Sequence, residues 1–476
     1  MKKIMKKIKK IFILFLITPL VFSSCLKKEV IKKDNSPKEL TVWNLFDDTA
    51  VFEGQIQSFS SLYPWTKINY KKFSEIDFYE WLLLDQLAEW KWPDIFVIKN
   101  TDLKKWKWKL EPLFVWWTTK PMNVQIYNET FLPVIWENLI DEWKIYWMTP
   151  YVDTLALYYN KWYFEDNFAS WKPAETWNKL TKQVQQLTRS NNSIEKFALS
   201  WIAMWRSDNI VRSNDILYLL MMQYWTEFYD DKIWKAVFAD IQWNRNISWD
   251  SQKPWEKALT LYTSFWKPLF KNYSWNKEIT SKYLEKSEAY PFVYWKTAAI
   301  FWYSYLKNDL EKIISQIRSK WDETISKENI WIIETPQVWY FSETWRRDSL
   351  VSYFPFVISK NTKNPKLAWD FLIYLSSKES SLDYFEKTNK VSSRLDLIED
   401  QKLEKTYWVF ARSASYWKSY PKFVIDSKKY DTIFNEAIQK INNNKTKPST
   451  AISNSQRKIQ CLIDKSNKKD IYTKCL

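Results

Sequence analysis

Histidine is absent from the 476-residue chain, and glycine occurs once, at Gly54. Without histidine the chain cannot form a Ser-His-Asp or Cys-His nucleophilic relay or an HExxH zinc site, whereas chemistry based on carboxylates remains open. With one glycine it has almost no residue suited to the positive backbone φ angles of tight turns and helix ends. A chain long enough for two or more lobes still needs such turns.

Tryptophan is as abundant as glycine is rare. The 33 tryptophans and the single glycine together make about 7% of the chain, which is the share that glycine alone has in an average protein. Trp65 follows a proline in a turn-like position, and Trp90 and Trp225 end helical patterns. We therefore predict that most tryptophans stand at UGA codons that the source organism reads as glycine.

Three tryptophans are predicted to be genuine, because Trp43, Trp177 and Trp369 lie inside apolar strand or helix patterns. The alternative is a truly Trp-rich chain of the aromatic carbohydrate-binding kind. Such a chain would have to build its turns almost without glycine, which disfavours this alternative.

The N-terminus has the pattern of an export signal. A lysine-rich start is followed by the apolar run Ile11–Phe22, which is too short to span a bilayer and is typical of a secretory signal. The run ends in FSSC, which resembles a bacterial lipobox, although Phe22 departs from the usual Leu or Val. We predict a signal peptide at 1–24, a lipidated Cys25 and a membrane tether at 25–39. A plain secretory signal with an incidental cysteine is the alternative.

The charge and the cysteines indicate the class of partner and the state of the thiols. The net charge is +16, but six lysines precede Cys25 and the remaining excess is dispersed, which argues against a nucleic-acid partner. In an exported protein Cys461 and Cys475 are expected to form a disulfide, with two free thiols as the alternative. Residues 442–476 are predicted to be a polar tail, loosely ordered up to about Lys458.

Between tether and tail, strand and helix patterns alternate. Strands are predicted at LTVWNLF, KINYKKF and Asp94–Ile98, with helices at Phe52–Leu62 and Phe78–Glu89 between them. This βαβαβ order predicts an α/β fold with a parallel sheet. No glycine-rich phosphate loop is found, even when tryptophans are read as glycine.

With the suspect tryptophans read as glycine, a series of motifs resembles the family-1 extracellular solute-binding proteins of ABC importers, the group that includes maltose-binding protein. LTVWNLF with FEGQIQSFSSLYPWTKINY is similar to the first strand, helix and Tyr-Pro-Gly turn of the family, and AEWKWPDIFVI to its Gly-Lys-Gly-Pro-Asp segment. YWMTPYVDTLALYYNKWYFED resembles its crossover region. PAETWNKL, VYWKTAAIFWYSYL and SKNTKNPKLAWDFLIYLSSKES extend the resemblance, which covers about Leu40 to Arg394.

The resemblance implies a two-lobed periplasmic-binding-protein-like fold of type II, with discontinuous lobes joined by a hinge that closes around a ligand. The N-terminal lobe is expected at 40–152 and 289–342, and the C-terminal lobe at 153–288 and 343–441. The chain is then expected to cross between lobes near Thr149–Asn160, Glu288 and Glu343.

The function implied by the resemblance is that of a lipid-anchored binding protein on the extracytoplasmic face of the cell membrane. It would capture a sugar or oligosaccharide, deliver it to an ABC permease, act as a monomer and use no cofactor, metal or catalytic group.

Ligands of open α/β sheets bind beyond the carboxyl ends of the strands, and sugars favour carboxylates, amides and aromatic rings. In the family, the positions matching Asp47, Asp153 and the aromatic after the Gly-Lys-x-Ala-Met segment often contact sugar. Trp43 could instead belong to the core, and Asp47 or Asp48 could cap the next helix. The predicted ligand-binding residues are Trp43, Asn44, Asp47, Asp48, Asn100, Tyr151, Asp153, Tyr303 and Tyr305.

Two other classes of protein remain as alternatives. A secreted glycosidase needs only two carboxylates at a suitable separation, and a chain with 55 acidic residues always offers such a pair. A Trp-rich adhesive or carbohydrate-binding lipoprotein is favoured if the tryptophans are genuine. The binding-protein interpretation is preferred because the lipobox, the βαβ start and the ordered motifs agree without any catalytic residue.

Overall fold

The computed structural model describes residues 38–476, except for 90, 115–117, 121, 194–195, 205, 243–252, 275–286, 339–346, 420–422, 424, 467–474 and 476. The chain divides into two units, 1–38 and 39–476, and all described residues except Lys38 belong to the second. The predicted signal peptide, lipidation site Cys25 and most of the tether lie outside the described residues.

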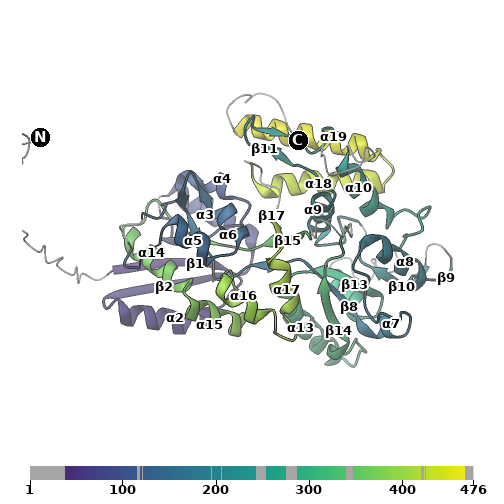
Figure 1. Ribbon diagram of the computed structural model, residues 1–476, viewed down its shortest axis with the longest axis horizontal. Helices are drawn as coiled ribbons and strands as arrows, with labels where there is room; N and C mark the ends of the chain where they lie inside the picture. The colour runs from purple at the N-terminus through teal and green to yellow at the C-terminus, as the bar shows by residue number, and fades with distance from the viewer. Residues whose placement is uncertain are drawn as a thin grey trace, which may run out of the picture. The chain divides into compact units, whose positions relative to one another are not determined.

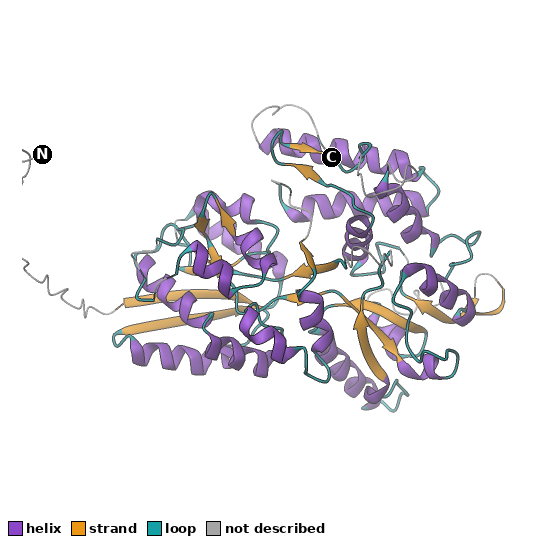
Figure 2. Cartoon of the chain, in the orientation of Figure 1, coloured by secondary structure: helices purple, strands orange, loops and turns teal. Residues whose placement is uncertain are grey.

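The first lobe is built on a five-stranded sheet with the order β2-β1-β3-β16-β6 (Figures 1 and 2). Strands β1 and β3 run parallel, and β16 is antiparallel to both of its neighbours, β3 and β6. The strands are β1 (Lys38–Leu45), β2 (Thr66–Phe73), β3 (Ile95–Val97), β6 (Trp147–Met148) and β16 (Phe356–Ile358). The predicted βαβαβ start is therefore confirmed.

Helices surround this sheet because each offers it an apolar stripe, as α2 does with the buried Phe52 and Phe59. The helices of this lobe are α2 (Thr49–Leu62), α3 (Ile76–Ala88), α4 (Leu103–Trp106), α5 (Val124–Thr130), α6 (Pro133–Leu139), α14 (Pro365–Leu375), α15 (Lys378–Thr388) and α16 (Leu395–Gln401). A short turn, η1 (Lys107–Lys109), and the hairpin β4 (Ile140–Asp141) and β5 (Lys144–Ile145) complete it.

The second lobe has its own five-stranded sheet, with the order β14-β8-β13-β10-β9. Strand β13 is buried along its whole length between β8 and β10, so it consists of apolar and small residues. The strands are β8 (Ala156–Asn160), β9 (Arg189–Ser193), β10 (Lys196–Ile202), β13 (Thr297–Trp302) and β14 (Ile330–Glu334). A separate hairpin pairs β11 (Tyr229–Asp230) with β12 (Lys235–Ala236).

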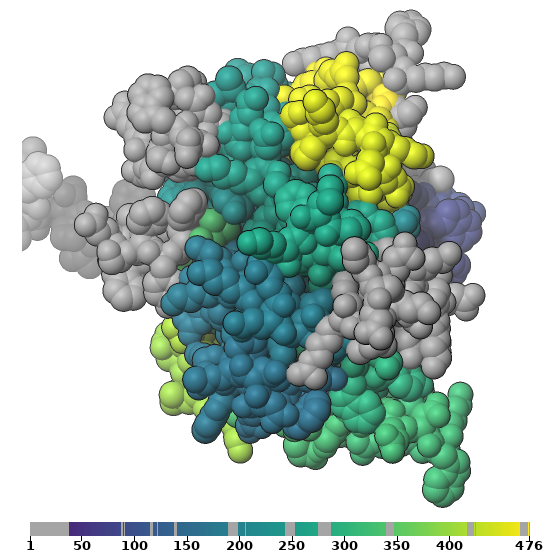
Figure 3. Space-filling model, turned by 90° about the vertical axis from the view of Figure 1, so that its right-hand side faces the viewer, coloured from purple at the N-terminus to yellow at the C-terminus, as the bar shows by residue number. Residues whose placement is uncertain are grey.

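The helices of the second lobe include two long C-terminal ones, drawn in yellow in Figure 3 against teal residues of the same lobe. The helices are α7 (Lys161–Glu165), α8 (Trp177–Leu187), α9 (Ser213–Gln223), α10 (Pro254–Ser264), α12 (Ala289–Val293), α13 (Leu306–Arg318), α17 (Trp408–Ala414), α18 (Ser427–Asn442) and α19 (Pro448–Ser466), with the turn η4 (Lys327–Asn329).

A small three-stranded sheet lies where the chain passes between the lobes. It has the order β17-β15-β7, formed by β17 (Trp417–Ser419), β15 (Ser349–Ser352) and β7 (Asp153–Thr154). The crossing predicted at Thr149–Asn160 is confirmed, because β6 belongs to the first sheet and β8 to the second. Glu343, where another crossing is predicted, lies outside the described residues.

The predicted assignment of residues 289–342 and 343–441 to the lobes does not agree with the strand pairing. Within 289–342, β13 and β14 both pair with β8 in the second lobe. Within 343–441, β16 pairs with β3 in the first lobe. The crossing predicted near Glu288 is also wrong, because Glu288 caps α12 within the second lobe. Motif order along a chain does not specify which strands pair, and this is the physical reason for the error.

The predicted polar tail is largely helical where the structure describes it. Residues 442–458, expected to be loosely ordered, belong largely to α18 and α19. Buried residues on α19 recur every three or four positions at Ala451, Ile452, Ser455, Ile459 and Ile463, which is the pattern of an amphipathic helix. Cys461 on this helix is disulfide-bonded to Cys475, with the Cα atoms 5.5 Å apart.

Seven tryptophans have positive φ angles between 54° and 80°, in a set of eleven such residues in the described part of the chain. The seven are Trp65, Trp143, Trp171, Trp225, Trp234, Trp295 and Trp321. This region of φ is easily reached only by glycine, and by Asn and Asp among other residues. Trp65 and Trp225 are thus turn residues as predicted, whereas Trp90 lies outside the described residues.

Trp225 shows the role most clearly. After α9 its N–H donates to the Met222 carbonyl (2.9 Å), and the Thr226 N–H donates to the Met221 carbonyl (2.8 Å). These two bonds define a Schellman motif, in which the positive-φ residue is usually glycine. Trp295 occupies the corresponding place after α12.

Candidate functional site

Asp47, at the carboxyl end of β1, is held by two side chains from a distant part of the chain. The Lys390 Nζ lies 2.7 Å from one carboxylate oxygen, and the Tyr384 hydroxyl donates to the other at 2.7 Å. Asp47 and Lys390 keep only 10% and 12% of their side chains exposed. This partly desolvated ion pair fixes the carboxylate at the edge of the first sheet.

Tyr151 extends this cluster towards the crossing between lobes. Its ring stacks on Tyr384 with centroids 5.5 Å apart, and Lys390 Nζ lies 4.6 Å from its ring centroid. The Tyr151 hydroxyl accepts a hydrogen bond from the Phe354 N–H (3.2 Å), in the segment between β15 and β16. Burial raises the pKa of Tyr151, and the neighbouring Asp47 and Asp153 carboxylates raise it further.

Asp153 begins β7 in the crossing sheet and connects to the second lobe. Its carboxylate accepts hydrogen bonds from the Ser304 N–H and hydroxyl, both at 2.9 Å. Burial raises the pKa of Asp153 to about 6, although the two hydrogen bonds from Ser304 oppose this shift. Ser304 follows the carboxyl end of β13, where ligands of such sheets bind.

Tyr303 and Tyr305 flank Ser304 and have different environments. Tyr303 is buried and its carbonyl accepts from the Tyr158 hydroxyl. Tyr305 is partly exposed, and its hydroxyl accepts a hydrogen bond from the Arg212 guanidinium. Burial raises the pKa of Tyr305 while the Arg212 charge lowers it and the Asp153 charge raises it.

Four predicted residues therefore lie near enough for their charges to influence one another's pKa. Asp47 and Asp153 both act on Tyr151, and Asp153 also acts on Tyr305. The series Asp47, Tyr151, Asp153 and Tyr305 runs from the first lobe through the crossing to the second lobe. It presents carboxylates, hydroxyls and rings, which together can bind the hydroxyls and the C–H face of a polar solute.

Three other predicted residues contact side chains within the first lobe. Trp43 is 8% exposed and packs on Phe73 of β2 (5.0 Å), so it belongs to the core. The Asn44 amide donates to the Tyr70 hydroxyl and its oxygen accepts from the Leu45 N–H. Asp48 is exposed and paired with Lys72 (2.6 Å).

The predicted alternative role of Asp48 is to cap the next helix. Asp48 occupies the N-cap position of α2, but its side chain makes no capping hydrogen bond.

Asn100, just beyond β3, is 3% exposed, and neither polar atom of its amide has a hydrogen-bond partner. A buried amide without a partner is costly, so Asn100 remains a candidate for contact with a ligand or with water.

Sequence reasoning missed Arg212, Ser304, Tyr384 and Lys390. Ser304 could have been found, because it lies between two predicted residues at the end of a strand pattern. Tyr384 and Lys390 reach Asp47 across more than 330 residues of sequence, and no local pattern indicates such a contact.

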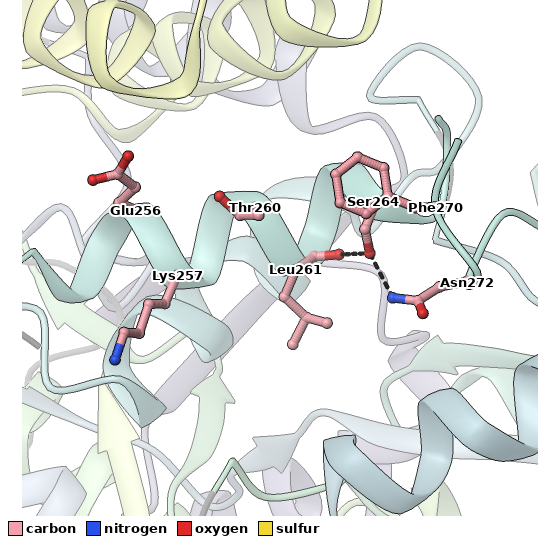
Figure 4. Close-up of a pocket in the computed structure, with 7 residues that line it drawn as sticks. All are labelled: Glu256, Lys257, Thr260, Leu261, Ser264, Phe270 and Asn272. Atoms are coloured by element: carbon pink, nitrogen blue, oxygen red, sulfur yellow. Dashed lines mark hydrogen bonds between the residues drawn. The ribbon is translucent and has the colours of Figure 1, made fainter. Parts of the chain in front are cut away.

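A separate surface pocket of about 360 Å³ lies on α10, and none of the predicted residues lines it (Figure 4). Figure 4 shows Asn272 donating to the Ser264 hydroxyl, which donates to the Leu261 carbonyl; both distances are 2.7 Å. The pocket is lined by Glu256, Lys257, Thr260, Leu261, Ser264, Phe270 and Asn272.

Two other kinds of site are not found among the described residues. No three His, Cys, Asp or Glu side chains in the described ranges gather in a way that could hold a metal ion. None of the helices in the described part of the chain is both long and apolar enough to cross a bilayer.

Comparisons with known proteins show the class of fold. No protein-family model and no curated protein sequence matches the chain. Many solved structures do, and three of them have 14–17% identity and TM-scores of 0.63–0.68. The fold is thus the two-lobed, type II periplasmic-binding-protein fold, as predicted.

The first of these structures is a solute-binding protein of an ABC transporter from Thermotoga lettingae, bound with α-D-tagatose. It has a TM-score of 0.63 and 17% identity, and the match covers 90% of this chain and all of that one. An ABC substrate-binding protein from Listeria monocytogenes, in complex with cycloalternan, has a TM-score of 0.66 and 14% identity over 91% of this chain and all of that one. The sugar-binding protein MalE from Xanthomonas citri has a TM-score of 0.68 and 14% identity over 90% and 98% of the two chains.

Proposed function

We propose that this protein captures a sugar or oligosaccharide by closure of its two lobes and passes it to an ABC permease. The observation that carries the proposal is the polar series Asp47, Tyr151, Asp153 and Tyr305, which spans both lobes and the crossing sheet. A ligand bound to all four side chains stabilises the closed arrangement, because an open arrangement separates them.

A saccharide is the solute class that fits these groups best. Carboxylates and hydroxyls in a dry site match sugar hydroxyls, which donate and accept together, and the Tyr305 ring offers a face to sugar C–H groups. The tagatose and cycloalternan bound in two structural neighbours support this class. Binding requires no chemical step, so the protein acts as a carrier and not as an enzyme.

The location that we propose is the extracytoplasmic face of the membrane, with the protein held there by acylated Cys25. The support is the sequence alone: the signal-like run Ile11–Phe22, the FSSC motif and the polar tether. Two acyl chains on one cysteine give stable anchoring. The anchored monomer would dock transiently on its permease.

We further propose that the seven positive-φ tryptophans are glycine in the protein made by its own cell. Positive φ at these positions supports the proposal, because glycine adopts it without strain. Trp143 adds a specific argument. Glu142 and Trp143 both have positive φ between β4 and β5, as in a type I′ hairpin turn, whose second residue is preferentially glycine.

Ligand binding is tested by thermal unfolding and calorimetry with a panel of mono- and oligosaccharides. We expect one saccharide to raise the melting temperature, and Asp153→Asn and Tyr305→Ala to abolish that shift. Turnover of a glycan without such stabilisation would support the glycosidase alternative and overturn the carrier proposal.

The recoding proposal is tested by peptide mass spectrometry of the protein from its native host. Peptides that contain positions 143, 225 and 295 are expected to have glycine masses, whereas the peptide with Trp177 retains tryptophan. Tryptophan masses at all positions would favour the Trp-rich adhesive alternative.

A further inference from the structure

Helix α18 of the second lobe faces a basic segment of the first lobe. The segment follows β3 and carries Lys99 and Lys105. The Lys105 Nζ lies 2.6 Å from the Asp426 carboxylate, which precedes α18, and Lys99 lies 3.4 Å from Asp431 within α18. Asp102, between the two lysines, accepts a hydrogen bond from the Ser427 N–H at the start of α18 (3.3 Å).

Three further ion pairs, made by two lysines, flank this contact with different exposure. Lys104 lies 2.6 Å from Asp231 in the β11–β12 hairpin, and Lys428 on α18 lies 2.9 Å from Glu80 on α3 and also pairs with Asp77. In the inner pairs the first lobe supplies the lysine, whereas Lys428 of α18 pairs with carboxylates of the first lobe. Only one position of α18 along the first lobe therefore brings opposite charges together in all these pairs.

The two inner pairs, Lys99–Asp431 and Lys105–Asp426, can contribute most to the contact between the lobes. Lys99 and Lys105 are 17% and 19% exposed, and Asp431 and Asp426 are 25% and 23% exposed. Asp231 and Asp77, in contrast, are 72% and 86% exposed, and such surface pairs contribute little.

Both inner aspartates are also held in place by their own lobe. The Tyr218 hydroxyl of α9 donates to Asp431 Oδ1 (2.8 Å), and Asp426 Oδ1 accepts from the Lys428 N–H as the N-cap of α18. The carboxylates therefore present their second oxygens to the first lobe without losing much side-chain freedom.

The fold of α18 does not depend on these pairs. Its apolar face packs inside the second lobe through buried residues that include Tyr430, Phe434 and Ile438. The ion-pairing residues thus add a contact between lobes to a helix that is already anchored. The contact also lies near the polar series that includes Tyr305, because the Asp215 charge acts on both Lys99 and Tyr305.

We propose that α18 is a clasp between the lobes, in which Lys99–Asp431 and Lys105–Asp426 are positioning residues that hold the closed arrangement and slow the release of bound solute. This inference rests on the proposed function for its effect on solute. Lobe contact itself is measured without any ligand, so the two proposals fail separately.

The test is small-angle X-ray scattering of the full-length protein without solute. Asp426→Asn with Asp431→Asn removes both charges but keeps the acceptors for the N-cap and for Tyr218. We expect a larger radius of gyration than in the wild type, and a similar increase in the wild type in 1 M salt, where surface and half-buried ion pairs are screened. An unchanged radius in the variant and in salt would overturn the clasp.

Matched controls separate the clasp from general loss of charge. Glu436→Gln removes from the same helix a carboxylate whose partners among the described residues are Lys440 and Lys458 of the second lobe, and should leave the radius unchanged. In a double-mutant cycle, Lys105→Gln should have no further effect once Asp426→Asn is present. Independent effects of the two substitutions would contradict the pair.

Where a saccharide ligand is found, stopped-flow dissociation gives the second measurement. The Asp426→Asn and Asp431→Asn protein should release the ligand about tenfold faster, with a smaller change in the association rate. Unchanged release together with an increased radius would restrict the clasp to the unliganded protein and overturn its effect on solute.

Discussion

The two lobes share a core architecture but differ in how well their sequence suits their backbone. The first lobe has two of the seven positive-φ tryptophans, Trp65 and Trp143, whereas the second has five. In the first lobe the site carboxylate Asp47 has Lys390 and Tyr384 as partners. In the second lobe the buried Glu288 has one oxygen without a hydrogen-bond partner. The second lobe therefore contains more positive-φ tryptophans whose backbone strain a glycine substitution would relieve.

The largest effect is expected from replacing the five tryptophans with positive φ in the second lobe by glycine. Each left-handed residue other than glycine costs roughly 1 kcal/mol or more, so the five replacements should raise the free energy of unfolding by about 5 kcal/mol. The replacements are at Trp171, Trp225, Trp234, Trp295 and Trp321. Urea unfolding monitored by circular dichroism measures the change.

Replacing Trp65 and Trp143 of the first lobe by glycine sharpens the comparison between lobes. The two replacements together should raise the free energy of unfolding by about 2 kcal/mol. Trp162→Gly is the control, because Trp162 is exposed within the helix α7 and glycine should destabilise a helix there by about 1 kcal/mol. Equal destabilisation in all three variants would show that these turns accept tryptophan without strain.

The next largest effect is expected at Glu288, through pH. Burial raises the pKa of Glu288 from 4.5 to about 7, so the folded protein favours the protonated carboxyl more than the unfolded chain does. The associated stability is complete below pH 4.5 and is lost as the pH rises through 7, by about 3 kcal/mol in total. Glu288→Gln should remove this loss, as measured by urea unfolding between pH 4.5 and 8.

A carboxylate that is ionised in both states serves as the comparison. The Lys458 and Lys440 partners of Glu436 lower its pKa, so Glu436→Gln should leave the loss of stability between pH 4.5 and 8 in place. An identical pH dependence in the wild type and in Glu288→Gln would show that the buried carboxyl does not titrate in this range.

Trp177 of the second lobe, which is predicted to be a genuine tryptophan, should behave in the opposite way to the turn residues. Trp177 is 2% exposed, and its indole N–H donates to the Gln223 amide oxygen at 2.8 Å. Trp177→Phe leaves that oxygen buried and unpaired, which should cost about 2 kcal/mol in the free energy of unfolding. If this substitution stabilised the protein, Trp177 would behave like the positive-φ tryptophans, and the expected difference between the two kinds of tryptophan would be contradicted.

The sequence predicted the elements that depend on local pattern and failed where distant contacts decide. The βαβαβ start follows from alternating periodicities, and Trp65 and Trp225 follow from turn chemistry. The pairing of β13 with β8 depends on burial from both sides, which motif order does not contain. In α19, the abundance of Lys, Ser and Asn hid a helical stripe of isoleucines.

The same division applies to the site. The proximity of Asp47, Tyr151, Asp153 and Tyr305 was predictable because they lie near strand ends at the edge where ligands of such sheets bind. The partner of Asp47 was not, since Lys390 comes from the chain beyond α15. Lys99 and Asp102 also lie at the predicted edge, but they contact α18 of the other lobe. Strand ends therefore indicate where polar side chains gather, but not which of them bind ligand and which join the lobes.

The smallest predicted effect concerns Ser304, which connects the second lobe to Asp153 of the crossing sheet. Two Ser304 donors lower the pKa of Asp153, which burial raises to about 6. Ser304→Ala removes the hydroxyl but keeps the N–H, so the pKa of Asp153 should rise further, by an amount equivalent to about 1 kcal/mol. If the Asp153 carboxylate binds the solute, the pH below which affinity falls should rise by the same amount in calorimetric titrations. Ser315→Ala, which removes an exposed hydroxyl from α13, should leave that pH unchanged. An affinity independent of pH between 5 and 8 in both proteins would remove Asp153 from the binding site and leave it as a purely structural link between the lobes.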